Sequence, residues 1–220
     1  AARYRDMFES HKLFPPERMT VLRPGEVSHF PLKKTKIGIC QRGEHVGKGC
    51  DFLPEVIKSL RPEIRDCIEL HFKGKGWDDQ FEGKTFRGAF FFGGNKPEEW
   101  FTGSYHGVSA FSYASEDEKS YPAFYGKLDY FLVPSRWEGG GMGALEAFAT
   151  GLPTISSDVG WMNEFGVEHL YRPGDVAGLV EILTTIASRR IGRRNKVSGM
   201  SYKNYASEVL KFFHHLRELK

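Results

Sequence analysis

The sequence has few cysteines and no long apolar run. Its 220 residues include only Cys40, Cys50 and Cys67, whose odd number and spacing fit neither a disulfide framework nor a zinc site. No segment reaches the roughly 20 apolar residues of a membrane-spanning helix, and no signal peptide is evident. These absences predict a cytoplasmic protein with reduced thiols.

An excess of charge of one sign is also lacking. The chain has 31 basic and 28 acidic side chains and a net charge of +3, so its charge indicates no nucleic-acid partner and gives no support for peripheral membrane contact. The basic run of residues 189–196 is interpreted as a solvated loop, with contact to anionic lipid or an acceptor as the alternative. The eight histidines show no metal-ligand pairing, and Asp78-Asp79 lacks the spacing of a DxD site. We therefore predict no metal, and we expect the two aspartates at the surface.

Strands and helices alternate along the chain. Buried strands are predicted at residues 35–40, 66–72, 129–135 and 152–158. Helices are predicted at residues 51–64, from Ser115, at 142–150 with Gly151 just after, at 175–188, and at 201–220. Residues 81–108 show no clean period and are expected to form a strand with an irregular insertion. This alternation predicts an α/β fold with a Rossmann-like, doubly wound parallel sheet.

The stretch Pro134–Asp158, PSRWEGGGMGALEAFATGLPTISSD, contains the most informative motif. Gly139, Gly140, Gly141 and Gly143 lie between a predicted strand and a predicted helix. Glycine allows close approach of a ligand, and the first N–H groups of a helix favour an anion, so this loop predicts a phosphate site. A glycine loop without a ligand is the alternative. The Gly-Lys-Ser/Thr ending of a P-loop is absent, and the run lies too late in the chain for the dinucleotide fingerprint.

Two carboxylates bracket the glycine loop. Glu138 precedes it, and Glu146 lies about one turn into the helix. Carboxylates repel phosphate but accept strong hydrogen bonds from hydroxyl groups. A phosphate flanked by two hydroxylated groups describes a nucleotide sugar, with ribose on one side and the transferred sugar on the other.

These residues resemble the signature of retaining GT-B glycosyltransferases of family 4. The segment EGGGMGALEAFATGLPT, residues 138–154, is similar to the family's E-x7-E motif, with Gly140 where an aromatic is usual and Thr154 where Val is usual. Other similar segments are VLRPGEVSHFP, KIGICQRGEHVGKGCDFL, LDYFLVPS and RPGDVAGLVEIL. The resemblance covers residues 15–185. It departs from the family at Glu26-Val27, where Asp is common, and at residues 81–111, which are expected to contact the base.

The resemblance implies a role for each candidate residue. Arg42 and Lys48 would clamp the diphosphate and stabilise the leaving group in place of a metal, and Glu138 would contact the donor sugar. The N–H groups of Gly140, Gly141 and Met142 would hold the distal phosphate, and Glu146 would bind the ribose. No cofactor is implied, since the nucleoside-diphosphate sugar is itself the donor substrate.

The resemblance also implies a domain organisation. Residues 1–31 are expected to form a leading helix and interdomain linker, and 32–220 the nucleotide-sugar-binding domain with a terminal helix. The chain thus resembles the C-terminal half of a GT-B enzyme, whose acceptor-binding N-terminal domain is missing, and it is expected to be an incomplete enzyme. The alternatives are a non-catalytic nucleotide-sugar-binding module that needs a partner, and a GT-B epimerase or phosphorylase. A phosphorylase would need a pyridoxal-binding lysine, for which there is no motif.

Overall fold

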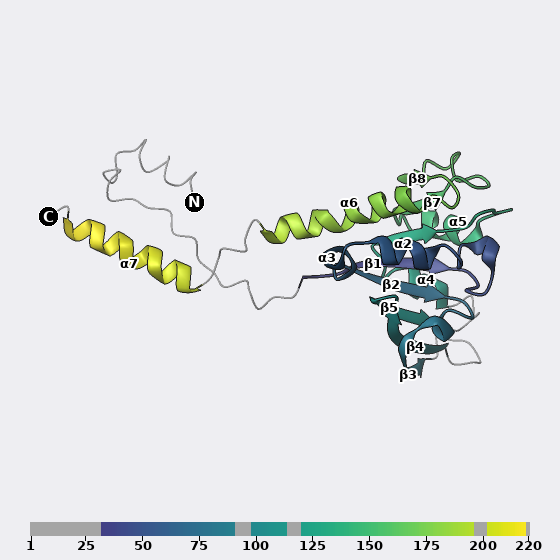
Figure 1. The fold of residues 1–220 in the computed structure, drawn as a ribbon, viewed down its shortest axis with the longest axis horizontal. Coiled ribbons are helices and arrows are strands. Elements are labelled where there is room, and N and C mark those ends of the chain that lie inside the picture. The colour runs from purple at the N-terminus through teal and green to yellow at the C-terminus, as the bar shows by residue number, and fades with distance from the viewer. Residues whose placement is uncertain (1–31, 91–97, 114–119, 196–201, 219–220) are drawn as a thin grey trace. The chain divides into compact units, whose positions relative to one another are not determined.

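The computed structural model describes residues 32–90, 98–113, 120–195 and 202–218. The chain divides into two units, Lys33–Arg190 and a second formed by Ala1–Leu32 with Ile191–Lys220, and each is treated by itself. The first unit contains the sheet and most of the helices (Figure 1). The expected leading helix and linker lie outside the described residues, so the division at residue 31 stays a prediction.

The described strands form one sheet of eight. They are β1 Thr35–Cys40, β2 Ile68–Lys73, β3 Glu82–Phe90, β4 Glu98–Tyr105, β5 Val108–Tyr113, β6 Tyr130–Val133, β7 Thr154–Ser157 and β8 His169–Tyr171. Their order is β3-β4-β5-β2-β1-β6-β7-β8, with β3 at one end and β8 at the other (Figure 1). From β5 to β8 every neighbouring pair is parallel. This confirms the predicted doubly wound α/β fold.

The described helices lie between these strands or follow the last of them. The α-helices are α2 Leu53–Ser59, α3 Pro62–Arg65, α4 Tyr121–Tyr125, α5 Met142–Ala149, α6 Val176–Asn195 and α7 Tyr202–Glu218, and the 3-10 helices are η2 Val46–Lys48 and η3 Asp78–Gln80. Helix α5 ends as expected, because Gly151 has φ of +72° and stops it. Helix α6 begins where the Asp175 carboxylate accepts a hydrogen bond from the Gly178 N–H at 2.9 Å. The expected start of α4 at Ser115 lies outside the described residues.

The sheet is covered on both faces. The chain steps along the sheet in one direction from β1 to β2 and in the other from β6 to β7, so right-handed crossovers place α2 and α5 on opposite faces. On the side of α4 and α5, Cys40 packs against a buried apolar cluster. This cluster comprises Phe124, Tyr125, Phe131, Val133, Ala144, Ala147, Leu152, Val159 and Met162. Because side chains alternate along a strand, the fully buried Ile37 and Ile39 of β1 face the other side.

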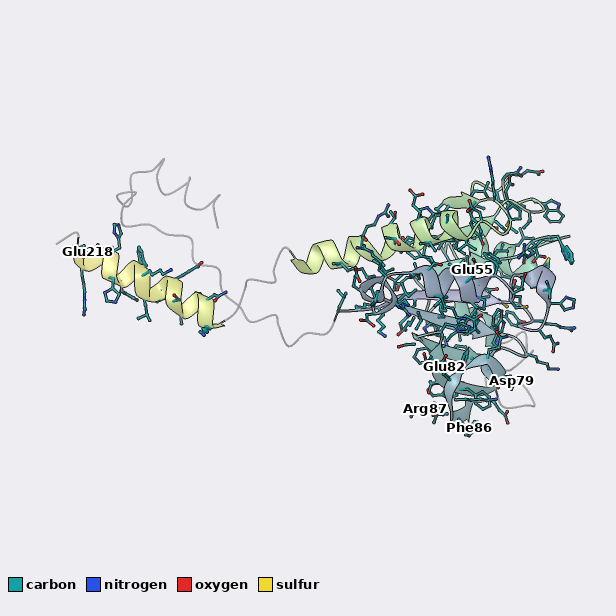
Figure 2. The ribbon with its side chains drawn as sticks, in the orientation of Figure 1. Glu55, Asp79, Glu82, Phe86, Arg87 and Glu218 are labelled. Atoms are coloured by element: carbon teal, nitrogen blue, oxygen red, sulfur yellow. The ribbon has the colours of Figure 1, made fainter. Side chains whose placement is uncertain are left out.

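The middle of the chain is more regular than its sequence pattern predicts. Strands β3, β4 and β5 run antiparallel and extend the parallel sheet at one edge. The turn between β4 and β5 is His106-Gly107, both with positive φ, which is the backbone of a tight two-residue hairpin. Figure 2 shows Glu82, Phe86 and Arg87 on β3, and Phe86 is 56% exposed. Residues 82–87 of β3 are exposed and its pairing with β4 shifts register, so this segment lacks a clean alternation of polar and apolar residues.

Three further elements depart from expectation. Helix α6 continues to Asn195, so the segment interpreted as a solvated basic loop is helical over all but its last residue. Strand β8 has only three residues, too few for a periodic pattern, and the sequence analysis missed it. Asp78 is 14% exposed rather than fully at the surface, because Lys84 pairs with it at 2.5 Å, whereas Asp79 is 77% exposed.

Helix α7 belongs to the second unit. Tyr205, Val209, Phe212 and Leu216 recur at helical spacing and are half-buried, as the sequence predicts, whereas Phe213 is exposed. Across the described ranges, no helix combines the length and apolar composition needed to cross a membrane.

Candidate functional site

A cavity of about 580 Å³ lies where the carboxyl ends of β1 and β6 meet. The two strands are parallel neighbours, with Ile37 opposite Tyr130 and Gly38 opposite Phe131, so the loops that follow them converge. The direction in which the chain adds strands to the sheet also reverses here. From β1 the chain moves to β2 on one side, whereas β6 and the strands after it lie on the other side. Ligands of doubly wound folds bind at such a switch point. The cavity is lined by Cys40, Gln41, Arg42, His45, Lys48, Phe131, Leu132, Val133, Glu138, Gly139, Gly140, Gly141, Met142, Gly143 and Ala144.

The loop after β1 brings two cations to the cavity. The Gly43 N–H donates to the Lys75 carbonyl at 2.9 Å, and the Trp77 indole donates to the Gln41 carbonyl at 2.7 Å. These bonds anchor the loop on the segment that follows β2. Arg42 is exposed and forms no ion pair within the described part of the chain, and Lys48 ends η2. An anchored backbone with a free guanidinium is suited to binding an anion.

The glycine loop leads into the N-terminus of α5. Gly141 is the N-cap residue with φ of +46°, and a Cβ there would lie 2.3 Å from the Met162 side chain. Gly139 and Gly140 have open space around them. Among the described residues, no acceptor is bonded to the N–H groups of Gly140, Gly141 and Met142. These unsatisfied donors and the helix dipole create a local positive potential at the cavity.

Glu138 is paired with Lys48 across the cavity. The Lys48 Nζ lies 2.7 Å and 2.6 Å from the two carboxylate oxygens, and the Lys48 and Glu138 side chains are 34% and 9% exposed. The buried Ser135 hydroxyl donates to Glu138 Oε1 at 2.6 Å. Gln41 connects the two loops, since its amide donates to the Lys48 carbonyl and its oxygen lies 3.3 Å from the Ser135 hydroxyl.

Glu146 lies beside the cavity and does not line it. Its carboxylate accepts a hydrogen bond of 2.7 Å from the Tyr125 hydroxyl, which also lies 3.1 Å from the Gly143 carbonyl. Burial, the nearby Cys40 thiol and the bond to Glu146 all raise the pKa of Tyr125. The pKa of Cys40 rises to about 11, mainly because of burial, with a smaller contribution from the Glu146 charge. Tyr125 and Cys40 therefore stay protonated at neutral pH.

The structure brings together most of the residues predicted from the sequence. Arg42, Lys48, Glu138 and the run Gly139–Gly143 line one cavity, although 90 residues separate Lys48 from Glu138. The described parts of the segment expected to contact the base, residues 81–90 and 98–111, are not among the residues that line the cavity, and the role of this segment stays a prediction.

Sequence reasoning missed Gln41, His45, Ser135 and Tyr125. Three of the four lie in the loops that follow β1 and β6, so their position at the carboxyl edge of the sheet was the available signal. No group of three His, Cys, Asp or Glu side chains gathers around a common point in the described ranges.

A doubly wound sheet with a basic loop and a glycine-rich helix N-terminus at its switch point defines an α/β protein with a candidate anion site at the carboxyl edge of its sheet. Residues 34–189 match the family described as Glycosyl transferases group 1, and because this match covers most of the chain, the chain belongs to that family.

The individual relatives match this chain either at low sequence identity or over a short stretch. The lipopolysaccharide core biosynthesis mannosyltransferase LpsB of Rhizobium meliloti (strain 1021) is 51% identical over 43 residues, which is 20% of this chain and 12% of that protein. The fold is similar to sucrose-phosphate synthase from Thermosynechococcus elongatus, with a TM-score of 0.51 and 16% identity over 87% of this chain and 47% of that one. It is also similar to the catalytic domain of cholesterol-alpha-glucosyltransferase from Helicobacter pylori, with a TM-score of 0.51 and 15% identity over 82% of this chain and 99% of that one.

This chain spans about an eighth of the mannosyltransferase and about half of the synthase. The likeness to the two solved structures concerns the fold.

Proposed function

We propose that this chain binds the nucleoside-diphosphate sugar donor of a retaining, metal-independent glycosyltransferase. The observation that carries the proposal is that Arg42, Lys48, Glu138 and the N-terminus of α5 line one cavity at the switch point of the sheet. The cavity combines two cations, unsatisfied backbone N–H donors and a carboxylate. A diphosphate with a hydroxylated group at its end matches this combination.

The diphosphate is proposed to lie between the two loops. Arg42 and Lys48 bind its oxygens from the β1 side, and the N–H groups of Gly140, Gly141 and Met142 bind the distal phosphate from the α5 side. As the bond to the sugar breaks, negative charge develops on this phosphate. Fixed cations and N–H dipoles stabilise that charge, which is the task that a metal performs in other transferases.

The two glutamates are proposed to bind the groups on either side of the diphosphate. Glu138 lines the cavity next to the glycine loop, where it can accept hydrogen bonds from hydroxyl groups of the donor sugar. Glu146 is one turn further along α5 and is proposed to bind the ribose hydroxyls. Tyr125 supports this role by donating to one carboxylate oxygen, which leaves the other oxygen as an acceptor.

The proposed reaction is transfer of the sugar to an acceptor hydroxyl with retention of configuration. The bond between the anomeric carbon and the phosphate oxygen breaks, and the acceptor oxygen bonds to the same face of that carbon. The acceptor proton passes to the departing phosphate oxygen, so the products are a glycoside and a nucleoside diphosphate. Arg42 and Lys48 stabilise the departing diphosphate throughout.

The acceptor is proposed to be bound by a further domain or chain. The cavity supplies groups that suit the donor, and the chain covers about half of the synthase that it resembles. The alternative is a non-catalytic nucleotide-sugar-binding module. Incubation of the chain with its best donor and a set of glycan and lipid acceptors distinguishes the possibilities, since repeated turnover per minute to a defined acceptor would show that the chain is a complete transferase.

Calorimetric titration in EDTA tests the donor proposal. The panel contains UDP-, GDP-, ADP- and dTDP-sugars and begins with GDP-mannose, because the 43-residue segment is similar to a mannosyltransferase. We expect one nucleotide sugar to bind without metal. Arg42→Met and Lys48→Met should each weaken its binding by about tenfold or more, since each removes a charged hydrogen bond.

Lys58→Met is the matched control, because Lys58 is an exposed lysine on α2 that does not line the cavity. An absolute requirement for Mg²⁺ or Mn²⁺ would refute metal independence. Binding that is unaffected by both Arg42→Met and Lys48→Met would refute the proposed phosphate site.

A further inference from the structure

Lys48 has two partners to bind, Glu138 in the structure and the phosphate in the proposed function. In the structure described here, the ammonium lies within 2.7 Å of both carboxylate oxygens. The proposed function requires the same ammonium to bind phosphate. A phosphate that approaches Lys48 while Glu138 remains beside it places two anions close together, and the repulsion favours separation of Lys48 from Glu138.

Glu138 needs another hydrogen-bond donor when Lys48 leaves. Its side chain is only 9% exposed, so water provides little compensation for a lost partner. A buried carboxylate without a donor is strongly unfavourable, and it would be driven to change its orientation. A donor sugar is recognised only if the carboxylate keeps its position.

Ser135 is placed to supply that donor. It is fully buried in the turn after β6, and its hydroxyl lies 2.6 Å from Glu138 Oε1, which is the short distance of a bond to an ionised oxygen. The hydroxyl has one proton, and the carboxylate is a stronger acceptor than the Gln41 amide oxygen at 3.3 Å. From β7, the Ser157 hydroxyl donates to the Ser135 carbonyl and fixes its backbone. None of these contacts involves the Lys48 ammonium.

The Lys48 side chain can change partner while its backbone stays in place. Gln41 donates to the Lys48 carbonyl, and the Lys48 N–H donates to the His45 carbonyl at 2.9 Å. The exchange therefore needs only rotation of a half-exposed lysine side chain.

We propose that Ser135 is a positioning residue of the donor site. Its hydroxyl holds the Glu138 carboxylate toward the donor sugar after Lys48 has moved to the diphosphate. This inference rests on the proposed function and adds a residue to the part of the site that recognises the sugar. Because the bond from Ser135 is independent of Lys48, Ser135 affects discrimination between a nucleotide sugar and the bare nucleotide, and leaves the affinity for bare nucleotide largely unchanged.

The test compares two affinities in the full chain. Calorimetry measures dissociation constants for a nucleoside diphosphate and for the matching nucleotide sugar, using GDP with GDP-mannose and UDP with UDP-glucose. In Ser135→Ala, the affinity for the diphosphate should stay within about threefold of wild type. The affinity for the nucleotide sugar should fall by about tenfold, the size of effect expected for one hydrogen bond to a charged group.

Three variants serve as controls. Ser156→Ala removes a neighbouring, fully buried hydroxyl on β7 that bonds to the Ser157 carbonyl, so it should change neither affinity. In a Glu138→Gln background, Ser135→Ala should cause no further loss, because Ser135 acts through Glu138. Ser135→Cys keeps the volume with a weaker donor, so it should also lose sugar affinity, and it replaces the alanine variant if that variant unfolds.

The outcomes distinguish a failure of this inference from a failure of the proposed function. If wild type binds neither the nucleotides nor the nucleotide sugars, the donor site itself is wrong. If wild type binds them and Ser135→Ala weakens both ligands equally, or neither, then Ser135 is not a positioning residue. Loss of sugar affinity that persists in the Glu138→Gln background would also overturn the inference.

Discussion

At the scale of single residues, the main result is that the candidate groups already have partners. Lys48 is held by Glu138, and Glu146 is held by Tyr125. Arg42 is the cation of the cavity without an ion-pair partner in the described ranges. Ligand binding therefore competes with existing contacts at Lys48 and adds to existing contacts at Glu146, and substitutions of the two glutamates should have different effects.

Glu138→Gln should strengthen binding of a bare nucleoside diphosphate. Considered from the sequence alone, Glu138 is expected to matter only for the sugar. The structure shows that its charge also holds Lys48, and because the Lys48 side chain is 34% exposed we value the pair at about 1 kcal/mol. Freeing Lys48 should raise the affinity for GDP or UDP by about twofold to fivefold, measured by calorimetry. This gain in affinity should disappear when Glu138→Gln is combined with Lys48→Met. A gain that remains in the double variant would contradict competition between Glu138 and the diphosphate for Lys48.

Glu146→Ala should weaken binding of the bare nucleotide by about tenfold to a hundredfold. The physical reason is the loss of charged hydrogen bonds to the ribose hydroxyls, each worth roughly 1.5–3 kcal/mol. Tyr125→Phe is the matched control, since it removes the bond that orients Glu146 and keeps the carboxylate. It should have a smaller effect on affinity than Glu146→Ala. Equal effects of Glu138→Ala and Glu146→Ala on bare nucleotide would count against the two roles.

His71 should make the protein less stable in mild acid. The imidazole of this β2 residue is 3% exposed, stacks on Phe111 and contacts Tyr113 and Glu69. Burial lowers the pKa of His71, and the charges of Lys36 and Lys127 lower it further, whereas Glu69 opposes the shift. Since the unfolded state takes up the proton first, the free energy of unfolding falls as the pH drops below about 6.5.

The measurement is thermal unfolding of wild type and His71→Gln between pH 8 and pH 5. The melting temperature of wild type should fall with acidification, and the fall should be smaller in His71→Gln. Part of the dependence should remain, because burial also lowers the pKa of His106 and His169. His215→Gln, at an exposed position of α7, should match wild type. An unchanged pH dependence in His71→Gln would refute the assignment.

At the scale of elements, the start of α5 depends on backbone conformation more than on side chains. Gly141 is in the left-handed region, and a side chain there would meet Met162. Gly143 packs close to the Phe131 ring and the Cys40 carbonyl, which brings the helix against the sheet. The strands define the opposite wall of the cavity, so the position of α5 relative to β1 sets its width.

Gly141→Ala and Gly140→Ala form a matched pair in this loop. Gly141→Ala should lower the free energy of unfolding by about 1–2 kcal/mol through backbone strain, with a further loss from the contact with Met162. Gly140→Ala should be nearly neutral, because no atom lies within 4 Å of the added carbon. Denaturant unfolding measures both, and equal stability of the two variants would contradict the assigned conformation.

At the scale of the whole molecule, the cavity belongs to one unit of the chain. Among the residues that the structure describes, those that line the cavity lie within Lys33–Arg190. Arg190, the last residue of this unit, contacts residues within the same unit. Its guanidinium pairs with Asp129 at 2.8 Å and donates to the carbonyl of Lys33, the first residue of the unit, at 3.2 Å. Helix α7 belongs to the second unit and contributes no residue to the cavity.

A shortened chain of residues 33–190 should therefore bind nucleotide as well as the full chain does. We expect it to fold, as judged by a cooperative thermal transition, and its dissociation constant for the best nucleotide sugar should lie within about twofold of the full-length value. A shortened chain that folds and binds at least tenfold more weakly would show that the second unit contributes to the site.

Elements with a local pattern can be predicted without the fold. The sequence predicts a strand at residues 35–40, which form β1, and a helix at 142–150, which is α5 with Gly151 after it. Burial on both faces makes a parallel strand continuously apolar, and a glycine run before a helix is recognisable without knowing its neighbours. The order of these elements was enough to predict the doubly wound sheet, whereas Arg42 and Lys48 were implied by the resemblance to a glycosyltransferase family.

The pairing of residues that are distant in the sequence follows from the arrangement of the strands. Parallel strands bring the loops after β1 and β6 together, so Lys48 meets Glu138 and Tyr125 meets Glu146, and no local pattern records which rotamers they adopt. Strand β3 is exposed over residues 82–87, β4 is half-buried, and β8 is too short to show a period, so their identity depends on the strands beside them. Side-chain partners are set by the packing of the whole sheet, so the bond from Ser135 to Glu138 could be found only once the fold was known.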